Sequence, residues 1–129
     1  EGPVVASHSN CRALCDVRRN LTDEQLRAIR DTGGVIGVNV YHGFVHAEPR
    51  MQTAAMLARH AAHIAETIGP EHVACGFDFC EYFGPGNEGC EGMESCAQTG
   101  NFFFELERLG FSAAERQGIT SENLLRVLE

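Results

Sequence analysis

The chain has 129 residues, a net charge of -8 and 43% hydrophobic residues, so it is long enough for one domain and too short for two of ordinary size. The acidic balance and the scattered basic residues argue against nucleic acid as a partner, because binding to a phosphate backbone needs clustered Lys and Arg. No apolar run approaches the ~18 residues of a membrane span, and the hydrophobic content excludes a disordered chain.

The pattern along the chain is strand, helix, strand, helix, strand, and then helices. Short runs that are apolar on both alternations predict strands buried on two faces, at residues 4–7, 35–40 and 72–77. Right-handed crossovers through the helices would make all three strands parallel. The alternation of strands and helices gives an α/β fold class. Strands this apolar need neighbouring strands on both edges, so we expect a piece of a larger α/β fold or half of an assembly.

The first two helices are placed by their termini. Thr22 and Gln25 have the spacing of a capping box, and the helix that they begin is expected to end at Gly33. The second helix is expected over residues 49–68, with Met51 at the start of an apolar stripe, until a Gly-Pro pair stops it. This helix is long enough to pack across a sheet.

A long segment over residues 81–100, rich in Gly, Glu and Cys, follows the third strand and is interpreted as a solvated lid or binding loop on the substrate side, with metal binding by residues 81–96 as the alternative. The C-terminal third is predicted to be helical. One helix is expected over residues 102–109, a second begins at a capping box formed by Ser112 and Glu115, and Thr120 is expected to start the last helix.

The cysteines follow no Cys-x-x-Cys zinc pattern and are interpreted as free thiols in a reducing compartment, which favours a cytoplasmic location. Disulfides within the loop between residues 80 and 96 are the alternative. The chain has neither an initiator Met nor a signal peptide pattern, so a genuine N-terminus is doubtful. The six cysteines are Cys11, Cys15, Cys75, Cys80, Cys90 and Cys96.

Polar residues follow all three predicted strands at the same end, where parallel α/β folds collect their active sites. His8 follows the first strand, Asn39, Tyr41 and His42 end or follow the second, and Asp78 follows the third. An imidazole and a carboxylate that converge there suit a metal hydrolase, in which a neutral His binds Zn²⁺ and an Asp moves a proton. From the residues alone, a structural hydrogen-bonding role for His8 is the alternative.

Five stretches of the chain carry a family resemblance. In order they are PVVASHSNCRALCDVRRNLTDEQ, GGVIGVNVY, HAAHIAETIG, EHVACGFDF and ENLLRVLE. Together they resemble the C-terminal part of the membrane dipeptidase family, also called renal dipeptidases, among the amidohydrolase-like metal-dependent hydrolases. The match covers essentially the whole chain, and the SHSN and RRNL-DE blocks, with DF at the right distance, make it specific.

The resemblance implies a TIM-like (β/α)₈ barrel that holds two zinc ions and hydrolyses dipeptides by a metal-bound hydroxide. It implies that residues 1–129 are the C-terminal part of a single barrel domain, about three βα units plus terminal helices, with the N-terminal strands absent from this chain. By the same resemblance, His8 is a zinc ligand, Arg19 binds the terminal carboxylate of the substrate, and Asp78 serves in proton transfer. Bidentate recognition by Arg19 suits an enzyme for short substrates, because it fixes the distance from the free terminus to the scissile bond.

Two departures from the family leave alternatives open. Members commonly carry G-S-D-F-D-G where this chain has GFDFCE, so the second carboxylate is absent and Cys80 stands in its place. The remaining metal ligands, an H-x-D pair, a bridging Glu and a further His, have no counterpart here. The alternatives are therefore a catalytically incomplete fragment that serves as an assembly or interaction module, and a related amidohydrolase that acts on a non-peptide amide or lactone.

The expected partners are a dipeptide substrate and the missing N-terminal part of the barrel, with a homo-oligomer left open. Six other polar residues are assigned to packing, capping or backbone hydrogen bonding: His42, His46, Asn39, His60, His63 and Asn123. The alternatives are a place in the substrate pocket for His42 and His46, and a metal pair for His60 and His63, which lie three positions apart on a predicted helix.

Overall fold

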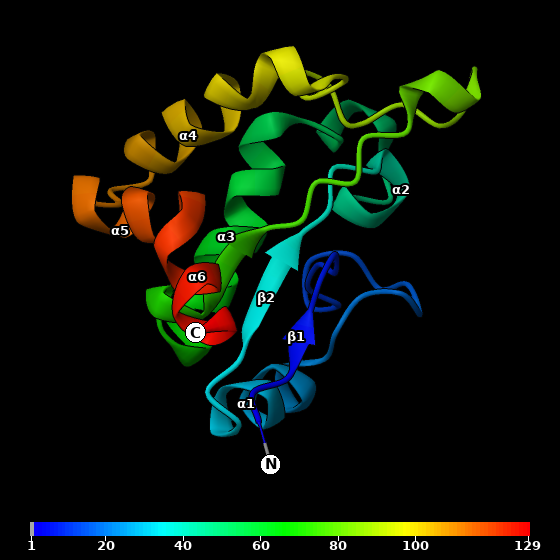
Figure 1. Ribbon diagram of the computed structural model, residues 1–129. Helices are drawn as coiled ribbons and strands as arrows, with labels where there is room; N and C mark the ends of the chain where they lie inside the picture. Colours follow the sequence, from blue (N-terminus) through cyan, green and yellow to red (C-terminus); the bar gives the residue numbers. More distant parts are fainter. Residues whose placement is uncertain (1) are drawn as a thin grey trace.

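A computed structural model describes residues 2–129 as one parallel sheet with helices packed on it. The strands β1 (Val5–Ala6), β2 (Val35–Val38) and β3 (Val73–Cys75) lie side by side in the order β1-β2-β3. Val5 is opposite Val35, and Ile36 is opposite Val73, with every pairing parallel. The arrows of β1 and β2 point toward the end of the sheet at which α2 lies (Figure 1). The predicted parallel arrangement is confirmed.

The strands differ in burial according to their place in the sheet. All four residues of β2 are buried, since it has a strand on each side and contacts α3 and α6. The first strand lies at the edge of the sheet, and Val4 and Val5 are 48% and 39% exposed. The expectation that each strand is buried on two faces is therefore wrong for β1, whose outer side pairs with nothing within residues 2–129.

The helix α1 (Asp23–Asp31) has the predicted termini. The backbone N–H of Thr22 donates to Oε1 of Gln25 at 2.8 Å, and the hydroxyl of Thr22 accepts from the backbone N–H of Gln25 at 3.2 Å, which completes the capping box. Beyond its last residue, Gly33 adopts a φ of +78°, the left-handed conformation that terminates helices and that glycine adopts without strain.

The helix α3 (Ala54–Ile68) starts later than predicted. Residues Pro49–Met51 form a separate 3₁₀ turn, and the extended backbone of Thr53 interrupts the helical path. The Thr53 hydroxyl accepts from the backbone N–H of Met56 at 3.1 Å, so Thr53 is the true N-cap. Met51 consequently lies outside the helix and is 37% exposed, not part of an apolar stripe.

The C-terminal helices form one nearly continuous run after α4 (Thr99–Arg108). A π-helical turn, Gly118–Glu122, joins α5 (Ala113–Gln117) directly to α6 (Asn123–Leu128). The expectation that Thr120 starts the last helix is therefore wrong: its hydroxyl donates to the carbonyl of Arg116 at 2.7 Å inside the run. The side-chain amide of Asn123 donates to the carbonyls of Pro70 at 2.9 Å and Val73 at 2.8 Å, and so anchors α6 beside β3.

The segment after β3 is only partly a solvated loop. Its tip, around Tyr82 and Phe83, is exposed, but Cys90 and Met93 are buried. The backbone N–H of Cys90 donates to the carbonyl of Val40 at 2.7 Å, which docks the second half of the segment against the chain beyond β2. The expectation of a solvated loop is therefore wrong for this second half, because backbone pairing holds it in the core.

All six cysteines are free thiols, including the two that frame the 80–96 loop. Within the part of the chain that the structure covers, no helix combines the length and the apolar character needed to cross a membrane.

Candidate active site

A cavity of about 320 Å³ lies at the carboxyl end of the sheet, where the loop before α1, the start of α2 (His42–Val45) and the segment after β3 meet. Arg19 and Asp78 both line this cavity, although 59 positions separate them in the sequence. Tyr41 and Phe44 form part of its apolar wall, and Phe83 closes it from the exposed tip of the segment after β3. The structure thus brings together two of the three residues that the sequence singled out.

The guanidinium of Arg19 lies over an aromatic ring at the cavity wall. Its Cζ atom is 5.6 Å from the ring centroid of Phe44, within the range of a cation-π contact. Arg19 is exposed to the cavity and forms no ion pair with any carboxylate of residues 2–129. The Phe44 ring therefore supports the side chain while its five N–H donors remain available for an anionic ligand.

Two buried asparagines hold the loop of Arg19 against the chain beyond β2. The side-chain amide of Asn20 donates to the carbonyls of Cys15 and Phe44, both at 2.9 Å. The Asn10 carboxamide donates to the carbonyl of Asn39 at 2.9 Å and accepts from the backbone N–H of Asn39 at 2.7 Å. Because both asparagines sit in the SHSN and RRN blocks, the signal was in the sequence, but their roles were not recognised there.

Asp78 is exposed at the cavity and has an unusual backbone conformation. Its φ is +59°, in the left-handed region that Asp tolerates better than most residues. The Cys80 thiol donates to Oδ1 of Asp78 at 3.6 Å. Desolvation, and then the charge of Asp78, raise the pKa of the Cys80 thiol, so it stays protonated as a donor at neutral pH.

His8 lies at the same end of the sheet but does not line the cavity. Its Nδ1 atom is 2.7 Å from the Ser7 hydroxyl. The ends of β1 and β3 come close here because Gly76 has no side chain: a Cβ atom at Gly76 would lie 1.7 Å from the Ser7 carbonyl oxygen and 3.2 Å from the His8 Cα atom. The sequence predicted this convergence, but not that His8 would stand outside the cavity wall.

The described residues fit one ligand position of a metal centre. A ligating His commonly uses its second ring nitrogen for a hydrogen bond, as Nδ1 of His8 does with Ser7, which leaves Nε2 for a metal. Across residues 2–129, however, no three His, Cys, Asp or Glu side chains gather as a metal site. The side chains of residues 2–129 can therefore supply a single metal ligand and not a whole centre.

The other histidines have structural partners, as assigned from the sequence. Nδ1 of His42 is 2.9 Å from the Glu88 carbonyl oxygen, and neither His42 nor His46 lines the cavity. Nε2 of His63 is 2.7 Å from Oδ1 of Asp23. The fully buried His60 accepts from the backbone N–H of Cys11 at 3.0 Å through Nδ1, and its Nε2 lies 2.7 Å from the Val45 carbonyl oxygen.

Asn39 and Tyr41 do line the cavity, so the chain just beyond β2 contributes to the site as well. Asn39 is buried, and its Oδ1 accepts from the backbone N–H of Tyr41 at 2.8 Å. This bond confirms the predicted backbone role of Asn39, while its position places it at the floor of the same space. Phe44 and Phe83 had no motif to mark them, and only the fold brings them to the cavity.

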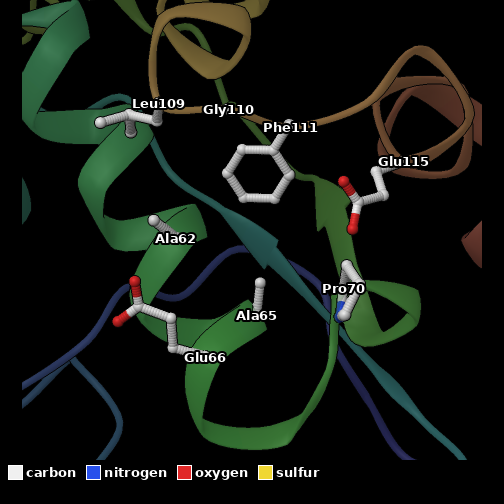
Figure 2. Close-up of a pocket in the computed structure, with 8 residues that line it drawn as sticks. All are labelled: Ala62, Ala65, Glu66, Pro70, Leu109, Gly110, Phe111 and Glu115. Atoms are coloured by element: carbon white, nitrogen blue, oxygen red, sulfur yellow. The ribbon is translucent and has the colours of Figure 1, made fainter.

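A second hollow, of about 240 Å³, lies between α3 and the connection from α4 to α5. Figure 2 shows the Phe111 ring over the small side chains of Ala62 and Ala65, with the carboxylates of Glu66 and Glu115 at the margins. Glu115 is engaged in the capping box with Ser112. None of the predicted site residues lines this hollow.

Comparison with known proteins shows the family of the chain. A model of the membrane dipeptidase family (peptidase family M19) matches residues 1–129. An uncharacterised protein in the pqqA 5′ region of Klebsiella pneumoniae is 50% identical over 80 residues, which cover 60% of this chain and 30% of that protein. Dipeptidase ataJ of Aspergillus terreus is 33% identical over 130 residues, with 100% of this chain and 31% of that protein covered. The chain thus spans about a third of the length of these relatives.

Solved structures share the fold. A metallopeptidase from Rhodobacter sphaeroides, crystallised with a phosphinate mimic of the dipeptide L-Ala-D-Ala, superposes with a TM-score of 0.85 and 28% identity. The superposition covers 99% of this chain and 36% of that one. The three strands and their helices therefore have the arrangement of the corresponding part of a metallopeptidase.

Proposed function

The chain belongs to the membrane dipeptidase family, and we propose that it supplies the substrate-carboxylate and proton-transfer side of a metal-dependent dipeptidase site. The observation that carries this proposal is the single cavity lined by both Arg19 and Asp78, in which the Arg19 guanidinium lacks a carboxylate partner within residues 2–129. A free guanidinium at the wall of a cavity of this size suits a small anionic ligand.

We further propose that these residues are the C-terminal part of a larger TIM-like (β/α)₈ barrel domain that binds two zinc ions. The exposed outer edge of β1 supports a further strand at that position, because an unpaired strand edge is otherwise a liability. The share of each relative that the chain covers agrees with a partial barrel. His8 would be one zinc ligand through Nε2, with the other ligands outside the described residues.

In this site Arg19 would bind the free carboxylate of the dipeptide. A guanidinium forms two parallel hydrogen bonds to a carboxylate, which fixes the position of the bound end and therefore of the peptide bond one residue away. A longer peptide held by the same carboxylate would place its last peptide bond at the same point. The anchored terminus thus selects the bond to be cleaved, and a restriction to dipeptides would also need a site with no room for a third residue.

Asp78 would then handle the proton. A carboxylate within reach of the attacking water can accept its proton and deliver it to the leaving amine. The Cys80 thiol donates to Oδ1 of Asp78 and leaves Oδ2 for this task. A metal ion, when bound, would supply the Lewis acid for the peptide carbonyl.

Dipeptide hydrolysis by the intact protein tests the proposal. Asp78→Asn keeps the size of the side chain but removes the base, and we expect kcat to fall by about 10²- to 10⁴-fold. His8→Ala should lower both zinc content and turnover. Unchanged turnover in both variants would contradict the site assignment. Turnover of non-peptide amides or lactones in place of dipeptides would favour a related amidohydrolase.

A catalytically incomplete module is the second candidate, because residues 2–129 contain no three-ligand group. Zinc analysis separates the two. The dipeptidase proposal expects stoichiometric zinc in the intact protein, whereas a protein that folds, binds no zinc and hydrolyses no dipeptide would be an assembly or interaction module.

A further inference from the structure

Phe83 occupies an unusual position for an aromatic side chain. It is 66% exposed, yet it lines the cavity that contains Arg19 and Asp78. The 3₁₀ turn Glu81–Phe83 presents it, with the backbone N–H of Phe83 donating to the Cys80 carbonyl at 3.0 Å. The Tyr82 ring lies beside it, with 4.5 Å between the ring centroids, so the two rings contact each other.

Apolar and aromatic side chains form a large part of the cavity wall, beside the polar Asn39 and Asn87. Val40, Tyr41, Phe44 and Phe83 contribute to it, and the Tyr41 and Phe44 rings meet edge to face with centroids 4.9 Å apart. Arg19 is the only cation and Asp78 the only anion among the lining residues. An acidic substrate side chain in this space would therefore lose water without gaining an ion pair of its own once Arg19 holds the carboxylate.

The position of Arg19 decides which substrate side chain meets this wall. Its guanidinium lies over Phe44, so a bound carboxylate is held beside the aromatic wall. The carboxylate of a dipeptide is attached to the Cα atom that carries the C-terminal side chain. That side chain is therefore the part of the substrate that is placed against the apolar residues, while Asp78 disfavours an acidic one by charge repulsion.

We propose that Phe83 is a specificity-determining residue, and that this site prefers dipeptides whose C-terminal residue has a large apolar side chain. The inference rests on the proposed dipeptidase function. Packing of that side chain would cover the exposed Phe83 ring, and the area removed from water would stabilise the bound substrate. A C-terminal Gly would leave the ring exposed, and a C-terminal Glu would meet Asp78.

Substrate profiling of the intact protein is the first test. With Ala as the N-terminal residue throughout, we expect kcat/KM for Ala-Phe and Ala-Leu to exceed that for Ala-Gly by about tenfold or more, with Ala-Glu the poorest substrate. Equal values for Ala-Phe and Ala-Gly, or a preference for Ala-Glu, would overturn the inference while leaving the dipeptidase function in place. Hydrolysis of none of these substrates would instead count against the proposed function.

The second test is the variant Phe83→Ala, for which we expect the ratio of kcat/KM for Ala-Phe over Ala-Gly to fall by about tenfold. Phe83→Leu keeps an apolar side chain and should retain most of the ratio. Phe104→Ala is the matched control, because Phe104 is 60% exposed on α4 and does not line the cavity. A ratio that is unchanged in Phe83→Ala, or that falls equally in Phe104→Ala, contradicts the inference.

Discussion

The carboxamide of Asn10 pairs with the backbone of Asn39 as a neighbouring strand would. Its Nδ2 donates to the Asn39 carbonyl at 2.9 Å, and its Oδ1 accepts from the Asn39 N–H at 2.7 Å. These two bonds continue the contact between β1 and β2 beyond their last paired residues, Ala6 and Ile36. The Asn10 side chain therefore helps to hold the segment that carries His8 against the floor of the cavity, together with the backbone N–H of Ser9, which donates to the Gly37 carbonyl at 2.7 Å.

We expect Asn10→Ala to destabilise the protein by about 3 kcal/mol, because it leaves the buried N–H and C=O of Asn39 without these partners. Urea unfolding of the intact protein measures the change. Asn101→Ala is the control, since the exposed Asn101 makes one hydrogen bond, to the Gly92 carbonyl, and its loss should cost about 1 kcal/mol or less. Equal midpoints for the two variants would contradict the bridging role of Asn10.

Arg19→Ala should weaken the binding of substrates with a free C-terminal carboxylate by about 10- to 100-fold, as the loss of a charge-assisted hydrogen-bonded pair implies. Arg19→Lys should recover only part of this loss, because an ammonium cannot form the two parallel bonds. The exposed neighbour Arg18 does not line the cavity, so Arg18→Ala should behave as the wild type. The measurement is KM for dipeptides and for their C-terminal amides. An equal rise in KM for both kinds of substrate would contradict the binding of the carboxylate by Arg19.

Substitutions at two glycines test the close approach of the ends of β1 and β3. Gly76→Ala places a Cβ atom where the Ser7 carbonyl oxygen now lies, so we expect a loss of at least about 2 kcal/mol and reduced activity as the ends of β1 and β3 separate. Gly100→Ala, in the exposed first turn of α4, has open space around its Cβ and should stabilise by about 0.5–1 kcal/mol. Thermal unfolding distinguishes them, and a stable, active Gly76→Ala protein would rule out the close approach.

The stability of the protein should fall in mild acid because of His60. Burial lowers the pKa of this imidazole from 6.5 to about 4. Between these two values the unfolded chain binds a proton that the folded protein does not, so the contribution is complete above pH 6.5 and is lost as the pH falls toward 4, to the extent of about 3 kcal/mol. Protonation would also end the bond that Nδ1 accepts from Cys11.

Denaturant unfolding at pH 7 and at pH 4.5 checks this dependence on pH, with His60→Gln as the comparison. The variant should be less stable at pH 7 because it disturbs two buried hydrogen bonds, but its stability should change less between the two pH values. If the wild type and the variant lose the same stability on acidification, His60 is not the group responsible.

Much of the fold follows from local patterns in the sequence. The capping boxes at Thr22 and Ser112 were predicted correctly, because each depends on residues three positions apart. The start of α3 was not, since Pro49 is compatible with a helical turn and the sequence does not reveal that Gln52 and Thr53 leave the helical path. The backbone hydrogen bond from Cys90 to Val40 joins positions far apart in the chain, and no local sequence pattern predicts it.

By itself, the sequence determined the α/β class, the parallel direction of the strands and the end of the sheet at which His8 and Asp78 lie, because the alternation of strands and helices dictates where strand ends meet. Arg19 was assigned by the family resemblance. The roles of His8, Arg19 and Asp78 stay predictions. Only the tertiary structure decided that Arg19 and Asp78 share a cavity that His8 does not line, and that Phe44 and Phe83 complete its wall. These positions depend on packing between segments that are distant in the chain, where side-chain shape and the absence of a side chain at Gly76 set the contacts.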